Sequence, residues 1–141
     1  MNRKSKRRIL RFLSHIPGVY ALLAFAFARR VTVNGDSMTP TLAAGERLLI
    51  DRLAYVRDLP QRGDIVMATH PLKPELRMVK RLTGLPGDKV EERTLKRGEY
   101  WVLGDNAGAS TDSRAFGPVR ARHLLGRAWL VYWPTGRWRT L

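Results

Sequence analysis

Short apolar runs, rich in β-branched and aromatic residues, constrain the fold of this chain more than any other feature. Glycine-containing turn signals, such as Arg62-Gly63-Asp64 and Pro86-Gly87-Asp88, separate these runs. The runs are Val31–Val33, Leu48–Ile50, Ile65–Ala68, Met78–Val79, Tyr100–Leu103 and Ala128–Trp133. No stretch after residue 30 keeps a helical period for three turns, although Arg120–Leu125 could form one short helix. The pattern predicts a mainly β domain, either a compact sheet or a partly open barrel.

The first thirty residues have a different character. Residues 1–30 hold eight Lys and Arg and no acidic residue, and an apolar stretch runs from Phe12 to Ala28 before Arg29 and Arg30. Seventeen residues are at the short end of what crosses a bilayer as a helix, and the flanking charges favour a cytoplasmic N-terminus. We therefore expect two parts, an anchor over 1–30 and a β-rich domain over 31–141. A cleavable signal peptide ending at Ala28 and an interfacial helix remain alternatives.

Charge and composition exclude several function classes. The net charge of +14 suggests nucleic acid at first, but more than half of the excess lies in residues 1–30. The remainder has no basic run interleaved with aromatic residues, so we expect no nucleic-acid partner. There is no cysteine, and the three histidines show no metal-ligand spacing, so we expect no metal. There is also no glycine-rich phosphate-binding loop, and we expect no organic cofactor.

Two segments offer a nucleophile and a base. Ser37 lies in Gly35–Leu42, where Gly35 frees the backbone and Pro40 stiffens the turn that should present the serine. Lys80 lies beside apolar neighbours in Met78–Leu82. A serine hydroxyl needs a base to remove its proton, and a lysine serves only if burial keeps it neutral. The non-catalytic alternatives are a Gly-Asp-Ser turn whose side chains cap the backbone and an edge-strand lysine with its ammonium group in solvent.

A third segment could orient such a lysine. Gly104–Arg114 is polar throughout and directly follows the apolar run Tyr100–Leu103. A buried, neutral lysine needs a hydroxyl or carbonyl group to orient it, and this segment supplies candidates, although a plain solvated loop would have the same composition.

Taken together, these segments resemble the conserved boxes of type I signal peptidases, which are membrane-bound serine endopeptidases with a Ser/Lys dyad. The boxes occur in order from Gly35 to Arg127 and cover essentially the whole chain beyond Val31. They are Gly35–Leu42, Arg62–Val66, Lys80–Asp88, Gly104–Arg114, Phe116–Val119 and Leu125–Arg127. The resemblance implies a compact β-fold of the signal peptidase and LexA type with one N-terminal membrane helix.

The resemblance also implies roles for individual residues. Ser37 would be the nucleophile, Lys80 the general base and Ser110 the hydroxyl that orients it, while Asp112 and Arg114 would form an ion pair that holds the loop. Gly35 and Met38, on either side of the nucleophile, complete the supporting set. Gly35 replaces a serine whose hydroxyl assists the oxyanion hole in some members, so that contribution must come from elsewhere or be absent.

A short segment between two of the boxes limits the resemblance to the smaller members of the family. Only eleven residues lie between Asp88 and Tyr100, so the chain looks like the mitochondrial inner membrane proteases and the small peptidases that mature nickel superoxide dismutase. The expected function is removal of signal or leader peptides from translocated proteins, with Ala-x-Ala-like cleavage sites. The expected location is the cell membrane, crossed once, with the catalytic domain on the extracytoplasmic face in contact with lipid.

Three alternatives stay open at this point. The chain could be a dedicated peptidase for one partner, such as nickel superoxide dismutase. It could be a self-cleaving repressor of the LexA type, although it has an apolar leader and no helical DNA-binding module. It could also be an inactive membrane-tethered binding domain, against which Ser37, Lys80 and Ser110 together argue.

Overall fold

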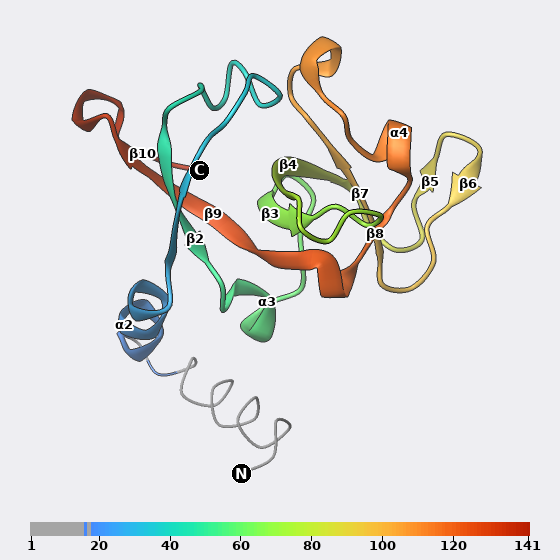
Figure 1. Ribbon diagram of the computed structural model, residues 1–141. Coiled ribbons are helices and arrows are strands. Elements are labelled where there is room, and N and C mark those ends of the chain that lie inside the picture. The colour runs from blue at the N-terminus through green and yellow to red at the C-terminus, as the bar shows by residue number, and fades with distance from the viewer. Residues whose placement is uncertain (1–15, 17) are drawn as a thin grey trace.

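The computed structural model describes residue 16 and residues 18–141, and its fold is mainly β (Figure 1). Eight strands form one antiparallel sheet in the order β1-β2-β9-β3-β4-β7-β8, with β10 paired to β9. Its strands are β1 (Arg29–Thr32), β2 (Arg47–Asp51), β3 (Ile65–Thr69), β4 (Arg77–Gly84), β7 (Glu99–Leu103), β8 (Val119–Arg120), β9 (Leu124–Trp133) and β10 (Arg139–Thr140). A separate hairpin joins β5 (Lys89–Val90) to β6 (Arg93–Thr94).

The helices are short. They are α2 (Val19–Ala26), α3 (Ala54–Arg57) and α4 (Ser113–Phe116), with 3-10 turns η1 (Ala107–Ala109), η2 (Ala121–His123) and η3 (Thr135–Arg137). The predicted β-rich class is therefore confirmed, and every predicted apolar run falls wholly or largely on a strand. The short helix considered over Arg120–Leu125 is wrong: the segment is a single 3-10 turn, because β9 already begins at Leu124 and pairs with Ala68 of β3.

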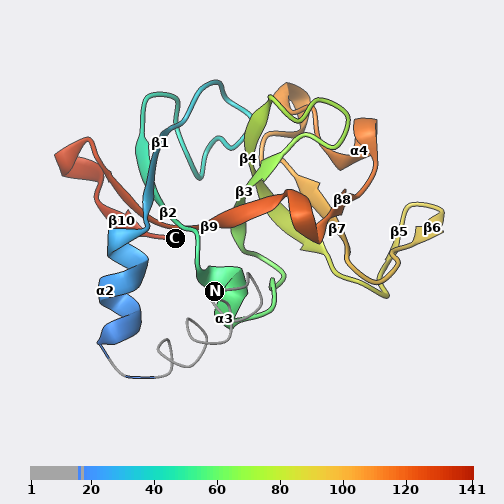
Figure 2. The same cartoon turned by 60° about the horizontal axis from the view of Figure 1, so that its bottom comes forward.

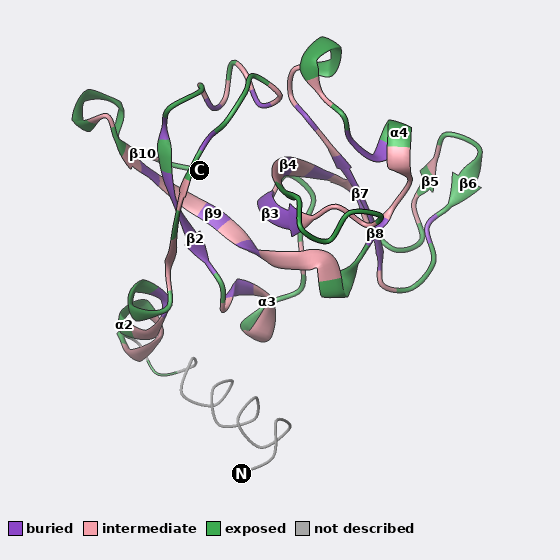
Figure 3. Cartoon of the chain, in the orientation of Figure 1, coloured by how far each residue is buried: buried purple, intermediate pink, exposed green. Residues whose placement is uncertain are grey.

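Strand β9 holds the two halves of the sheet together. One of its edges pairs with β2, and the opposite edge pairs first with β3 and then, at Leu130 and Val131, with β10, so β9 runs through the middle of the molecule (Figure 1). Strand β3 contributes to two apolar clusters: Ile65 and Met67 belong to the first, with Leu48, Ile50 and Val131, and Val66 on the opposite face belongs to the second, with Leu82 and Val102. Burial on both faces explains why β3 reads as a continuous apolar run rather than an alternating one (Figure 3).

Strands β1 and β4 leave two edges unpaired that face the same pocket. Strand β1 is at the end of the sheet, and within residues 18–141 its only partner strand is β2. Strand β4 pairs with β3 along residues 77–81, but its pairing with β7 begins only at Arg81. The outer edge of residues 77–80 is therefore open, and residues of both strands line a single cavity. Ser37, Met38 and Lys80, three of the predicted site residues, line this opening.

Helix α2 leads directly into β1 through Phe27 and Ala28 (Figure 2). The predicted anchor over 12–28 is only partly visible, because residues 12–15 and 17 lie outside the described residues, as does the basic segment before them. Within the described part of the chain, no helix combines the length and apolar character needed to cross a bilayer. Strand β1 begins at Arg29, two residues before the expected start of the β domain at residue 31.

Candidate active site

Ser37 lies in the turn that follows β1. The backbone N–H of Thr39 donates to the carbonyl of Asp36, and that of Leu42 donates to Met38, so the segment coils tightly. Gly35 makes the approach to this coil with φ of 79°, a left-handed conformation that favours glycine. Met38 and Leu42 are fully buried in the first apolar cluster and fix the turn from below. The side chain of Ser37 is left at the mouth of the cavity between β1 and β4.

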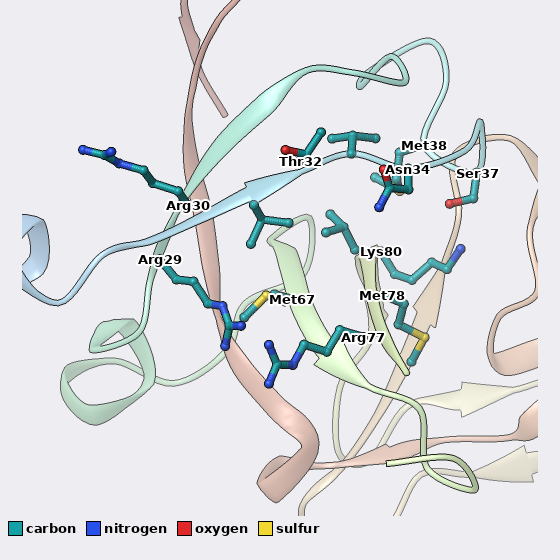
Figure 4. Close-up of a pocket in the computed structure, with 13 residues that line it drawn as sticks. Arg29, Arg30, Thr32, Asn34, Ser37, Met38, Met67, Arg77, Met78 and Lys80 are labelled. Carbon is teal, nitrogen blue, oxygen red and sulfur yellow. The ribbon is translucent and has the colours of Figure 1, made fainter. Parts of the chain in front are cut away.

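Lys80 is buried although it carries an ammonium group when protonated. It lies in β4 opposite Val66 of β3, and only 4% of its surface is exposed. Its Nζ donates a 3.0 Å hydrogen bond to Oγ of Ser110 and points toward the hydroxyl of Ser37 (Figure 4). Burial lowers the pKa of Lys80, the nearby Asp112 raises it in part, and Arg114 lowers it again. The net direction favours the neutral amine.

Asp112 lies behind Ser110 and is almost completely enclosed. It accepts hydrogen bonds from Ser110 Oγ at 2.7 Å, from the N–H of Gly104 at 2.9 Å, and from Nε and Nη2 of Arg114 at 2.9 and 2.7 Å. It also caps the N-terminus of α4. Burial alone raises the pKa of Asp112, but these donors outweigh it and hold that pKa well below its usual range. The carboxylate therefore stays ionised and fully engaged.

Gly104 is the residue that lets the loop and the serine turn approach each other. A side chain there would overlap the hydroxyl of Ser110 and lie 2.5 Å from the carbonyl oxygen of Ser37. The same carbonyl accepts a 3.0 Å hydrogen bond from the N–H of Asn106. Sequence reasoning placed Gly104 in a conserved box but assigned it no role, and a glycine at the end of an apolar strand, directly before Asp105, was the available signal.

A second charged cluster joins four of the sequence segments. Arg81 makes two hydrogen bonds to the carboxylate of Asp105, at 2.8 and 2.7 Å, and a third to the carbonyl of Gly63 at 3.0 Å. Thr41, from the serine turn, donates to the same carboxylate at 2.5 Å. Sequence reasoning did not identify this cluster, although an arginine directly after Lys80 and an aspartate directly after Gly104 were visible there.

The C-terminal strand supports the serine turn from the other side. Arg139 in β10 makes two hydrogen bonds to the buried carboxylate of Glu46, at 2.9 and 2.8 Å, and donates to the carbonyl of Thr41 at 2.5 Å. The pKa of Glu46 is lowered, mainly by the hydrogen bonds from Arg139. These contacts cross most of the chain length, so no local sequence signal predicts them.

The geometry therefore brings Ser37, Lys80, Ser110, Asp112 and Arg114 into one neighbourhood. The predicted ion pair between Asp112 and Arg114 is present. Among the described residues, no cluster of three or more His, Asp or Glu has the arrangement of a metal site. A hydroxyl beside a buried amine can support nucleophilic chemistry of the Ser/Lys type.

Comparisons with known proteins agree on one family. The family described as "Signal peptidase, peptidase S26" matches residues 6–95 and 91–133. Subunit 1 of the mitochondrial inner membrane protease of Xenopus tropicalis is 39% identical over 128 residues, which covers 83% of this chain and 77% of that protein. Subunit 2 of the Mus musculus protease is 37% identical, covering 84% and 77%.

Bacterial proteins match as well. A signal peptidase I of Leptolyngbya laminosa is 32% identical over 139 residues, covering 74% of this chain and 68% of its own. A solved signal peptidase I of Enterococcus faecalis aligns with 50% of this chain at 28% identity, with a TM-score of 0.44.

Proposed function

The chain belongs to the peptidase S26 family of signal peptidases, and from this premise we propose that Ser37 is its nucleophile and Lys80 its general base. As a member of that family it is a serine peptidase that processes signal or leader peptides of precursor proteins. The observation that carries the proposed dyad is the burial of Lys80 in the pocket that Ser37 also lines.

The first half of the reaction makes an acyl-enzyme. Neutral Lys80 accepts the proton of the Ser37 hydroxyl while the oxygen attacks the scissile carbonyl. The resulting tetrahedral intermediate collapses, and Lys80 passes its proton to the departing amine. In the second half of the reaction, Lys80 is neutral again and takes a proton from water, and the resulting hydroxide hydrolyses the ester. The proton returns to Ser37 as the leader is released, so the cycle needs no further acid or base.

The oxyanion needs a donor that is not already engaged. The backbone N–H of Ser37 donates to no acceptor among the described residues, and it belongs to the residue that carries the nucleophile. Such a donor is worth about a hundredfold or more in rate. Because residue 35 is glycine, no serine hydroxyl from that position assists, and any second donor must come from elsewhere.

The substrate would bind as an extended strand between β1 and β4. Both strands turn an unpaired edge toward the pocket, so the backbone of a precursor can pair with them in the manner of β-augmentation. Side chains at alternating positions of such a strand point toward the floor of the pocket. Small residues at those positions, as in Ala-x-Ala, would fit a floor already occupied by Val33, Met38 and Val79.

The protein is membrane-associated in this reading, as its family and its relatives' names indicate. We propose a single crossing near the N-terminus with the catalytic domain on the outer face. Basic residues before and after the apolar stretch 12–28 support this orientation.

The test is cleavage of an Ala-x-Ala precursor by the full chain in detergent or liposomes, with the product ends mapped by mass spectrometry. Ser37→Ala and Lys80→Ala should each lose cleavage, while Lys89→Ala, an exposed lysine of β5, should cleave normally. Lys80→Arg distinguishes a role as a positive charge from a role as a base, because an arginine does not lose its proton at working pH. Substantial cleavage by Lys80→Arg or Ser37→Ala would refute the dyad.

A further inference from the structure

The pocket that Ser37 and Lys80 share extends away from them and ends between two arginines. It is a cavity of about 430 Å³. Arg29 begins β1 on one wall and Arg77 begins β4 on the other. Figure 4 shows their guanidinium groups pointing toward each other, at the end of the pocket away from Ser37.

The strand rows explain why these side chains enter the pocket. Residues two apart in a strand share a face. Arg29 therefore lies on the same face of β1 as Val31, and Arg77 lies on the same face of β4 as Val79. Both valines pack against the first apolar cluster. The two arginines thus continue the rows of these valines to the rim of the pocket, where Arg29 is half-buried and Arg77 is exposed, and where the lining changes from apolar to cationic.

The protein supplies no carboxylate to these cations. All twelve acidic residues of the chain belong to the described part. Seven of them form the ion pairs of the structure, and within the described residues none comes within 4.0 Å of Arg29 or Arg77. Two guanidinium groups that converge in a partly enclosed space repel each other, and an anion between them removes that repulsion. The end of the pocket is therefore complementary to an anionic group.

We propose that Arg29 and Arg77 form a subsite for an acidic side chain of the precursor, at the fourth or fifth residue before the scissile bond. This rests on the proposed function, because it takes the pocket to be the precursor groove. Arg77 lies three residues from Lys80 along β4, or about 10 Å at the rise of a strand. An extended peptide advances by the same step, so the residue three positions before the one that acylates Ser37 lies beside Arg77.

The subsite lies on the leader side of the cleavage point. The Arg29 end of β1 is the end that joins the apolar helix α2 (Figure 2). A leader whose apolar part lies beside that helix enters the groove past Arg29 and reaches Ser37 last. An acidic residue just after the apolar part of the leader would then bind with both guanidinium groups, which can engage a carboxylate through paired hydrogen bonds.

The experiment compares matched precursors with the full chain. Each carries Glu or the isosteric Gln at one position from the third to the sixth before the scissile bond, and kcat/KM is measured for each pair. With the unaltered chain, Glu should be preferred about five- to tenfold at the fourth or fifth position. The preference should disappear in Arg29→Gln and Arg77→Gln, and Arg77→Glu should prefer Lys there. Arg30→Gln is the matched control, because Arg30 is adjacent and points away from the pair (Figure 4).

Binding provides a second measurement that does not depend on turnover. Fluorescence anisotropy with the Ser37→Ala protein should show the same ratio between Glu and Gln peptides, even if the proposed dyad were wrong. Equal values for Glu and Gln at every position, in both assays, would overturn the subsite. So would a preference confined to residues after the scissile bond. Loss of binding to vesicles of anionic lipid in Arg29→Gln and Arg77→Gln, with unchanged peptide ratios, would assign the pair to lipid instead.

Discussion

A single methyl group at residue 104 should disable the active site without removing any functional group from it. Gly104 is buried directly after β7, where the loop that carries Ser110 passes the serine turn. In Gly104→Ala, the new Cβ would overlap the hydroxyl of Ser110 and lie 2.5 Å from the carbonyl oxygen of Ser37. It thus enters the space between the proposed nucleophile and the residue that holds Lys80.

The size of the effect follows from these distances. Ordinary contact with a Cβ begins at 3.4 Å, so Ser37 or Ser110 must move by about 1 Å. A misplacement of that size can cost about a hundredfold in rate, because the reacting atoms leave their near-attack geometry. Overpacking of a buried position also costs about 1–3 kcal/mol of folding stability. The loss of activity should therefore far exceed what a modest fall in stability explains.

The assay measures kcat/KM on one precursor peptide and the thermal midpoint Tm of the same preparations. Gly108→Ala is the control, because it lies in the same loop and its new Cβ meets no atom closer than Oδ1 of Asn106 at 3.9 Å. It should stay within about twofold of the unaltered chain, as expected for a surface change. If folded Gly104→Ala turned over normally, the close approach of the two segments would have no part in catalysis.

Three further changes probe the polar contacts of the site. Burial lowers the pKa of Lys80 and Asp112 partly opposes that shift, so kcat/KM should rise with pH as Lys80 loses its proton. Asp112→Asn removes the opposing charge and should move this rise in the pH profile to lower pH. A rise centred near pH 10 would contradict a buried base. Ser110→Ala should lower kcat roughly ten- to a thousandfold, and combined with Lys80→Ala it should be no slower than Lys80→Ala alone; near-normal kcat would remove its positioning role. Arg139→Leu should lower the free energy of unfolding at pH 7 by about 2 kcal/mol, since Glu46 stays buried without its main cation. Because the pKa of Glu46 is lowered in the folded state, the stability that the ion pair contributes is lost as pH falls through that pKa. Denaturant unfolding curves of the unaltered chain and of Arg139→Leu should therefore converge at acid pH. A stability difference that stayed constant with pH would exclude the ion pair as the cause of the destabilisation.

Much of the fold could be predicted because its strands carry local signals. Apolar runs such as Ile65–Ala68 and Ala128–Trp133 are bounded by turn residues, and both lie within observed strands. The error at Arg120–Leu125 has a tertiary cause. Both ends of the segment pair with neighbouring strands, through β8 and β9, so only one 3-10 turn remains between them.

The site was predictable only where its residues occur in recognisable segments. Ser37, Lys80 and Ser110 stand in such segments, whereas the contacts that hold the segments together join residues far apart in the chain. Arg81 and Asp105 are separated by 24 positions, and Glu46 and Arg139 by 93. Neither pair has a spacing that a helix or hairpin imposes. The members of each pair come into contact only when β4, β7 and β10 have assembled in the sheet.

The charges around Lys80 explain how a lysine can lie beside a carboxylate and still favour the neutral form. Asp112 has Arg114 as its counter-ion through two hydrogen bonds, and its remaining lone pairs are engaged by Gly104 and Ser110. With that pair close to electrically neutral, burial dominates and lowers the pKa of Lys80. Ser110 donates its proton to Asp112, so its oxygen is free to accept from Lys80. This arrangement fixes the direction of the amine and leaves its own lone pair available for the proton of Ser37.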